Sequence, residues 1–96
     1  MVVRLHPEAL AEFGEAVAFY EDRAPGLGQE FFAEVQRVLR AIGENPSMGS
    51  PLDPPFRCLL CRRFPFGVVY QEDDHVVRVQ AVMHLRRKPA YWRDRG

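Results

Sequence analysis

The chain has 96 residues, of which 47% are hydrophobic, and its thirteen basic residues balance thirteen acidic ones. This length and composition predict a single globular domain, residues 1–96, and exclude a disordered chain. No apolar run approaches the ~20 residues that a membrane helix needs, and the N-terminus lacks the pattern of a signal peptide. We therefore expect a cytoplasmic protein with no membrane partner.

Charge is divided unevenly along the chain. Residues 1–55 hold four basic and nine acidic residues, whereas residues 56–96 hold nine basic and four acidic ones. The basic half could present a positive field to a phosphate backbone or to an acidic partner. The simpler interpretation, in which these charges only solvate the surface, stays open.

Residues 8–23 and 27–44 both have the apolar periodicity of amphipathic helices. Pro7 suits the first position of the first helix, and Ala24-Pro25-Gly26 breaks the chain between the two. Such a short link predicts an antiparallel helical hairpin. The first stripe comprises Leu10, Phe13, Val17 and Tyr20 beside Ala9 and Ala16, with the acids Glu8, Glu12, Glu15 and Asp22 off it. The second comprises Phe31, Val35, Val38 and Ile42, widened by Phe32 and Leu39.

Four stretches are β-prone: residues 2–5 before the helices and, after a proline-rich loop at 46–55, residues 56–64, 66–72 and 75–85. Asp73-Asp74 is a plausible two-residue turn between the last two strands. The resulting register pairs Tyr70 with Val77, Val68 with Val79 and Phe66 with Ala81, on one apolar face continued by Met83. The opposite face would then carry Gly67, Val69, Gln71, Val76, Arg78, Gln80, Val82 and His84.

These elements predict an α+β fold with an N-terminal strand, an antiparallel helical hairpin and then a three-stranded antiparallel meander. The helices would pack on the apolar face of the sheet, and the N-terminal strand would join that sheet. The reverse face would stay open and carry Arg78, Gln80 and His84. Both faces of the strand at 56–64 are apolar, so its inward face stays unassigned.

Cys58 and Cys61 have the C-x-x-C spacing of redox and zinc-binding pairs. No second pair completes four zinc ligands, and redox pairs normally lie at a helix N-terminus rather than in a strand. Residues i and i+3 of a strand point to opposite faces. We therefore expect two independent thiols, with no metal and no cofactor.

A histidine, a basic cluster and two aromatic residues gather where the last strand ends. RNA cleavage through the 2′-OH needs a base, an acid for the leaving oxygen and positive charge on the phosphorane. Histidine can transfer protons near neutral pH, and arginine suits phosphate oxygens. The candidate catalytic residues are His84, Arg87, Arg63 and Tyr91, and the candidate binding residues are Arg57, Arg62, Arg78, Gln80, Arg86, Lys88 and Trp92. Alternatively, His84 is a plain surface histidine, and Tyr91 and Trp92 pack the tail onto the helices.

Several segments, taken together and in order, resemble the RelE/ParE superfamily, the toxins of bacterial type II toxin–antitoxin modules. The Phe-Pro-Phe strand and the basic tail are most similar to ParE-like members of the plasmid stabilisation type. The segments are Pro7-Glu8-Ala9, Phe19-Tyr20, Pro25-Gly26-Leu27-Gly28, residues 31–35, Asn45-Pro46, Arg63-Phe64-Pro65-Phe66, Val69-Tyr70 and residues 82–92.

The resemblance implies a growth-inhibiting toxin that a cognate antitoxin neutralises by wrapping it with a C-terminal segment. ParE-like members bind DNA gyrase without covalent chemistry, whereas RelE-like members enter the ribosome and cut mRNA without a metal. A degenerate member would bind its antitoxin alone. RelE-like nucleases tend to be strongly basic, but this chain has one lysine and no net charge. We therefore expect a protein target such as gyrase.

The antitoxin is expected to dock on the apolar surface around the open sheet face and the 46–55 loop. An extended segment could add to a free sheet edge or lie in the groove beside the helices.

Overall fold

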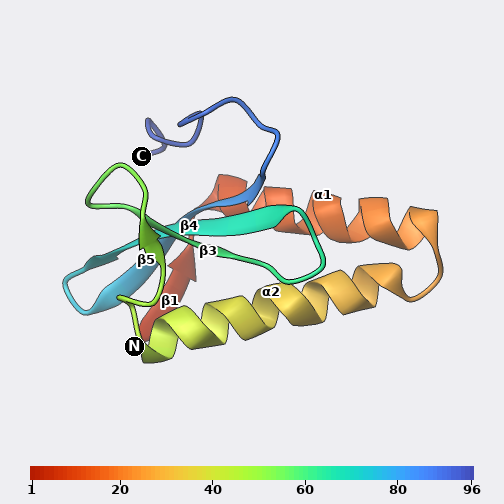
Figure 1. The fold of residues 1–96 in the computed structure, drawn as a ribbon, viewed down its shortest axis with the longest axis horizontal. Helices are drawn as coiled ribbons and strands as arrows, with labels where there is room; N and C mark the ends of the chain where they lie inside the picture. The colour runs from red at the N-terminus through yellow and green to blue at the C-terminus, as the bar shows by residue number, and fades with distance from the viewer.

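The computed structural model describes all residues from 1 to 96, with two helices packed on a five-stranded sheet (Figure 1). The predicted α+β class, helical hairpin and meander are confirmed. Strand β1 joins the sheet parallel to β5, so the sheet is mixed, and β2 is an additional short edge strand. The elements are β1 (Val2–Leu5), α1 (Pro7–Arg23), α2 (Leu27–Glu44), β2 (Ser50–Pro51), β3 (Arg57–Leu60), β4 (Phe66–Asp73) and β5 (Val76–His84), in sheet order β1-β5-β4-β3-β2.

The helical hairpin is closed by local contacts. Glu21 of α1 accepts hydrogen bonds from the backbone N–H groups of Gly26 and Gly28, both at 3.0 Å. Gly26 has φ 88°, a conformation that favours glycine. A Cβ on Gly28 would lie 2.6 Å from the carbonyl oxygen of Val17. This glycine therefore lets the two helices approach closely where they turn.

The helices bury one stripe each against the sheet. In α2 the buried side chains include Phe31, Val35, Val38 and Ile42, as the periodicity predicts. In α1 the buried side chains are Ala9, Phe13 and Ala16, whereas Leu10 is 60% exposed. The prediction that Leu10 belongs to the stripe is wrong. Adjacent residues lie about 100° apart around a helix, so the face that buries Ala9 and Phe13 turns Leu10 outward.

The turn between β4 and β5 is formed by Asp74 and His75, not by Asp73 and Asp74. Their φ angles are 53° and 62°, and two consecutive left-handed residues match the twist of a two-residue hairpin. Asp73 therefore pairs with Val76, which closes the strands one residue further along than expected. The predicted pairs Tyr70–Val77, Val68–Val79 and Phe66–Ala81 are wrong, and the observed ones are Tyr70–Val79, Val68–Val82 and Phe66–His84.

A β-bulge then interrupts β5. Tyr70 pairs with Val79, but its neighbour Val69 pairs with Ala81, so Gln80 is an extra residue on β5. An extra residue reverses the alternation of every side chain beyond it.

The bulge exchanges the faces of the end of β5. Val82 packs in the helix-side core and His84 lies against Phe66, whereas Ala81 and Met83 pack on the reverse side. The predicted placement of Ala81 and Met83 on the helix face is therefore wrong. So is the predicted placement of Val82 and His84 on the reverse face.

The reverse face of the sheet is not fully open as predicted, because the C-terminal segment, residues 85–96, returns over part of it (Figure 1). Trp92 is 1% exposed and packs on Val69, Ala81 and Phe56, with 4.8 Å between the rings of Trp92 and Phe56. Trp92 thus completes a second, smaller core on the sheet rather than packing on the helices, whereas Tyr91 and Arg95 of the same tail contact α1.

The loop after α2 is anchored to the sheet by Tyr70. The Tyr70 hydroxyl donates to the carbonyl of Pro46 at 2.6 Å and accepts from the N–H of Gly49 at 2.8 Å. Arg57 donates to the Gly49 carbonyl at 2.8 Å. These bonds hold residues 46–49 beside β3. Neither helix has the length and apolar character needed to cross a membrane.

Candidate functional site

Glu12, in the middle of α1, is the centre of a polar cluster beside the end of β5. Strand β1 pairs with β5 only as far as Val79, so the outer edge of β5 has no neighbouring strand beyond that residue. The Glu12 carboxylate accepts a hydrogen bond from the Val82 N–H at 3.1 Å, where a strand would otherwise pair. The Glu12 side chain is only 12% exposed, so its charge needs further partners.

The C-terminal segment supplies those partners. Arg95 donates two hydrogen bonds to the Glu12 carboxylate, both at 2.9 Å, and the Tyr91 hydroxyl donates a third at 2.6 Å. The same guanidinium, itself 10% exposed, donates to the Gln80 carbonyl at 3.0 Å. Helix α1, strand β5 and the C-terminal segment therefore meet at one carboxylate.

The cluster sets the protonation states of its members. Burial alone would raise the pKa of Glu12, but hydrogen bonds from Arg95 and Tyr91 outweigh it, so that pKa lies below its ordinary value. Burial and the hydrogen bond to Glu12 raise the pKa of Tyr91 well above its ordinary value. Glu12 is therefore ionised near neutral pH, and Tyr91 is a protonated donor.

Arg87 and His84 border the cluster. The Arg87 guanidinium lies 3.9 Å from the Tyr91 ring centroid and 3.9 Å from a Glu12 carboxylate oxygen. The His84 ring lies edge-to-face on Phe66, with 5.0 Å between centroids. His84 Nδ1 accepts the Arg86 N–H at 3.0 Å, so its Nε2 is the nitrogen left for other partners.

A pocket of about 390 Å³ lies between α1 and the end of β5. It combines an apolar lining with the carboxylates of Glu12 and Glu15, the His84 imidazole and the Arg87 guanidinium. An anion that entered would meet two carboxylates as well as one arginine. The full lining is Glu12, Glu15, Ala16, Phe19, Tyr20, Phe66, Val82, His84 and Arg87.

Of the four predicted catalytic residues, the structure brings three together. His84 and Arg87 line the pocket, and Tyr91 lies under Arg87. Arg63 is engaged elsewhere, because its guanidinium forms an ion pair with Glu30 of α2 at 2.8 Å. The grouping of Arg63 with the strand-end histidine is therefore not observed.

Two predicted binding residues lie away from the strand end. Arg78 pairs with Asp73 at 3.3 Å, next to the β4–β5 turn. Arg57 donates hydrogen bonds to the carbonyls of Ser47 and Gly49 and so holds the loop that follows α2. Neither residue contributes to the pocket.

Gln80 and Trp92 were predicted to bind a partner, but both are buried. Gln80 is 8% exposed, and its amide nitrogen donates to the carbonyls of Trp92 and Arg95, both at 3.0 Å. They are therefore parts of the reverse-side core rather than a binding surface. The remaining predicted binding residues are exposed and form no ion pair: Arg62, Arg86 and Lys88.

Glu12 and Arg95 are the members of the cluster that sequence reasoning missed. Glu12 lies off the apolar stripe of α1, as a solvated surface acid would, and Arg95 lies three residues beyond the last aromatic residue. Nothing local distinguishes a buried ion pair from two surface charges. The pairing becomes visible only once the path of the C-terminal segment is known.

The two cysteines lie on opposite faces of the sheet, as their spacing in a strand predicts. Cys58 packs with the reverse-side core, and Cys61 packs against the helix-side core. Leu59 also faces the helices, which settles the inward face of β3. Burial raises the pKa of the Cys58 thiol to about 11 and that of Cys61 to about 12. No group of three or more His, Cys, Asp or Glu side chains is arranged to hold a metal ion.

The fold, with its helical hairpin on a mixed sheet and its strand-end basic segment, is that of the RelE/ParE class of toxins. A solved structure described as "Chromosomal ParDE TA system from P. aeruginosa" has the same fold, with a TM-score of 0.79. The two chains are 16% identical, and the match covers 90% of this chain and 97% of that one.

A comparison of the sequence with family models identifies the family. The model described as "ParE toxin of type II toxin-antitoxin system, parDE" matches residues 3–89. The chain therefore belongs to the ParE toxin family of type II toxin–antitoxin systems. No curated protein matches it.

Proposed function

We propose that this ParE-family toxin inhibits growth by binding DNA gyrase and performs no covalent chemistry itself. The observation that supports this best is the Glu12 cluster. Tyr91 and Arg95 donate hydrogen bonds to that one carboxylate, and Arg87 lies 3.9 Å from it. Two of the groups that a nuclease would use on RNA, Tyr91 and Arg87, are therefore engaged within the fold.

The chemistry of RNA cleavage makes this point specific. A metal-independent ribonuclease needs a base, an acid and uncompensated positive charge at the phosphate. Here Tyr91 holds its proton, and Arg87 has Glu12 beside it. His84 Nε2 is left as a single proton-transfer group. This arrangement favours a binder over an enzyme.

A supercoiling assay with purified gyrase tests the proposal. We expect micromolar toxin to inhibit supercoiling, and we expect His84→Ala to inhibit it as well, because no proton transfer is involved. Unchanged topoisomer ladders with the wild-type protein would reject gyrase as the target.

A second candidate function, a metal-independent mRNA endonuclease acting on the ribosome, is favoured by one observation. His84 and Arg87 line the same pocket of about 390 Å³. If this function is correct, His84→Ala and Arg87→Ala abolish RNA cleavage in a translating extract and leave the fold intact. Absence of cleavage by the wild-type protein would exclude it. Normal growth during expression without antitoxin would instead identify a degenerate member that is not toxic.

We also propose that the neutralising antitoxin docks along β1. This strand forms one edge of the sheet. The His6 N–H donates to the Val79 carbonyl, so the even-numbered residues face β5, and Val3 and Leu5 direct their backbone groups outward. An extended antitoxin segment could pair with these groups by strand addition.

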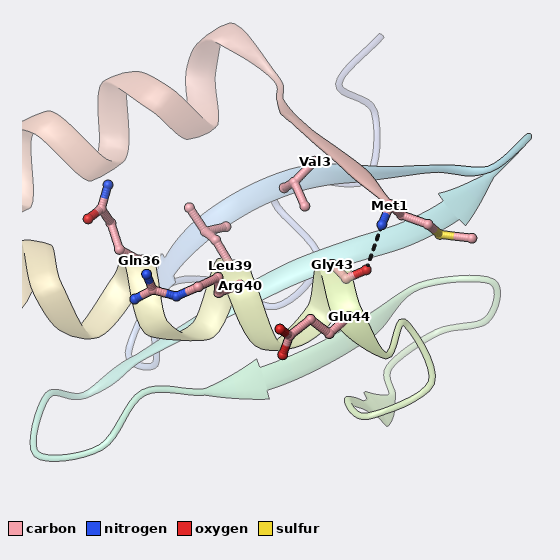
Figure 2. Close-up of a pocket in the computed structure, with 7 residues that line it drawn as sticks. All are labelled: Met1, Val3, Gln36, Leu39, Arg40, Gly43 and Glu44. Carbon is pink, nitrogen blue, oxygen red and sulfur yellow. Dashed lines mark hydrogen bonds between the residues drawn. The ribbon is translucent and has the colours of Figure 1, made fainter.

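A groove beside this edge could hold side chains of such a segment. It has a volume of about 570 Å³ and lies where β1 meets the second half of α2 (Figure 2). Figure 2 also shows the Met1 amine donating to the Gly43 carbonyl at 3.0 Å, which ties the N-terminus to α2. The groove is lined by Met1, Val3, Gln36, Leu39, Arg40, Gly43 and Glu44.

Hydrogen exchange tests this docking mode. The partner to test is the product of a reading frame adjacent to the toxin gene. We expect the amides of Val3 and Leu5 to exchange more slowly in the complex, while Ser50, on the opposite edge strand, is unchanged. Protection elsewhere with no change at β1 would show that the antitoxin binds another surface.

A further inference from the structure

The C-terminal segment covers only part of the reverse face of the sheet. Trp92 covers Val69 and Ala81. The next row of side chains toward the end of the strands is only partly covered: Met83 packs against the Trp92 cluster and Gly67 is buried, but Leu60 is 56% exposed. That row, paired across three strands, is Leu60, Gly67 and Met83.

Leu85 extends this row. A Cβ built on Gly67 would lie 3.3 Å from Leu60 and 3.7 Å from Leu85, so both leucines surround the same glycine. Leu85 is 48% exposed. We name Leu60, Gly67, Met83 and Leu85 the leucine strip. Large apolar side chains that lie exposed beside one another, rather than singly, are a feature of interaction surfaces.

The leucine strip is bordered by cations that have no internal partner. Arg86 and Lys88 follow Leu85 in the chain. Both are exposed, and neither forms an ion pair, whereas Arg62, Arg63 and Arg87 lie beside carboxylates of the helices. Residues 54–71 and 75–93 contain no acidic residue. The border of the strip is therefore positive.

We propose that the leucine strip is the surface with which this toxin docks on its protein target, and that the target presents apolar side chains flanked by carboxylates. This inference rests on the proposed function, in which the toxin acts by binding a protein. The exposed leucines supply apolar area to bury, and the two cations Arg86 and Lys88 select an acidic partner.

Two other occupants fit the strip less well. A nucleic acid would seek exposed aromatic rings on which to stack bases, but Trp92 is buried and Tyr91 lies under Arg87. A second copy of the chain in a symmetric dimer would place the same surface on both sides. Its unpaired cations would then face their own copies, which is unfavourable.

The test introduces a negative charge into the strip. Leu60→Glu and Leu85→Glu are compared with Leu10→Glu, since Leu10 is 60% exposed on α1 and lies outside the pocket and the strip. Binding to purified gyrase and growth arrest on induction are measured for each. We expect the two strip variants to bind gyrase about tenfold or more weakly and to relieve growth arrest. Leu10→Glu should match the wild type, and denaturant unfolding should show that all three variants are folded.

The outcomes separate this inference from the gyrase proposal. If wild-type and strip variants bind gyrase equally, the strip inference is wrong and gyrase remains the target. If wild type arrests growth without binding gyrase, and only the strip variants relieve the arrest, the strip is supported and gyrase is the wrong protein. If the strip variants still arrest growth but are no longer neutralised by the antitoxin, the inference is overturned. It is also overturned if their only defect is a loss of RNA cleavage or of dimerisation. A wild-type protein that does not arrest growth overturns both.

Discussion

The two halves of β5 are held in different ways. Before Gln80, the strand lies between β1 and β4, and Val77 faces the helices. After Gln80, β4 remains on one side, but Glu12 of α1 occupies the other edge at Val82. Trp92 covers this second half on the reverse face. The first half is therefore supported by regular secondary structure and the second by side chains that reach it from α1 and the tail.

This difference shows how one inserted residue can build a site. The bulge at Gln80 turns His84 toward α1 and the pocket, and it places Met83 on the reverse face as part of the leucine strip. Beyond Val79 the other edge of β5 has no neighbouring strand, because β1 ends there, and this is where Glu12 and Arg95 meet. The candidate site and the proposed docking strip both belong to the half that the tail stabilises.

Removing the Trp92 ring should have the largest effect, because it opens the reverse-side core over the second half of β5. We expect Trp92→Ala to lower the free energy of unfolding by about 3–5 kcal/mol, measured by urea denaturation. Trp92→Phe should cost less, because it keeps an aromatic ring against Phe56 and the Trp92 Nε1 has no hydrogen-bond partner to lose. Wild-type stability in Trp92→Ala would show that the tail does not support the sheet.

Neutralising Glu12 should weaken the same half from the helix side. Glu12→Gln leaves the Arg95 guanidinium, 10% exposed, without its carboxylate. We expect a loss of about 3 kcal/mol in unfolding free energy, as for one member of a buried ion pair. The matched control is Glu15→Gln, an exposed acid on the same helix, which should stay within about 0.5 kcal/mol of wild type. Equal effects of the two changes would contradict a buried role for Glu12.

Lowering the pH should remove the stability that the ionised Glu12 carboxylate contributes to the folded protein. Its pKa in the folded protein lies below the ordinary value of 4.5, so its contribution is present above that value and is lost as the pH falls toward the folded pKa. The difference in unfolding free energy between wild type and Glu12→Gln should therefore be full near neutral pH and shrink as the pH falls below 4.5. The hydrogen bond from Arg37 also lowers the pKa of Glu34. Glu34 is present in both proteins, so its contribution cancels in the difference between them. If the difference in unfolding free energy instead grew on acidification, the pKa of Glu12 would be raised rather than lowered in the folded protein.

The smallest effect is expected at the turn that begins the first half of β5. His75 has φ 62°, a conformation that costs a residue with a Cβ about 1 kcal/mol relative to glycine. His75→Gly should therefore stabilise the protein slightly, as seen by thermal unfolding. Glu72→Gly, two residues before the turn in β4, should instead destabilise it by about 0.5–1 kcal/mol. Two changes of the same sign would argue against the observed turn.

The helices were predictable because their signal is local. The spacing of Phe31, Val35, Val38 and Ile42 indicates the buried face of α2 without knowledge of any partner, and the structure confirms it. The hairpin register was not predictable to the same degree. The expected and observed registers differ by two residues in the first half of β5, and a shift of two keeps every side chain on its face. The alternating valines therefore fit both.

The bulge was hidden for a related reason. Ala81, Val82 and Met83 are all apolar, so exchanging their faces leaves no polar residue in the core to reveal the change. The grouping of His84, Arg87 and Tyr91 was predictable because these residues are close in sequence. Arg63 instead forms an ion pair with Glu30 of α2, a residue far away in sequence that a local pattern could not reveal.

The amino-acid sequence alone established the α+β class, the helical hairpin, the meander, the basic strand end and the resemblance to a toxin family. These features could be predicted because periodicity and short motifs are properties of neighbouring residues. Tertiary structure decided which face each residue of late β5 occupies and that Glu12 meets Arg95, 83 residues apart. It also decided that the tail covers part of a face expected to be open. These features depend on the path of the chain through space, and the energy of a buried ion pair or a sealed core exists only once distant segments have met.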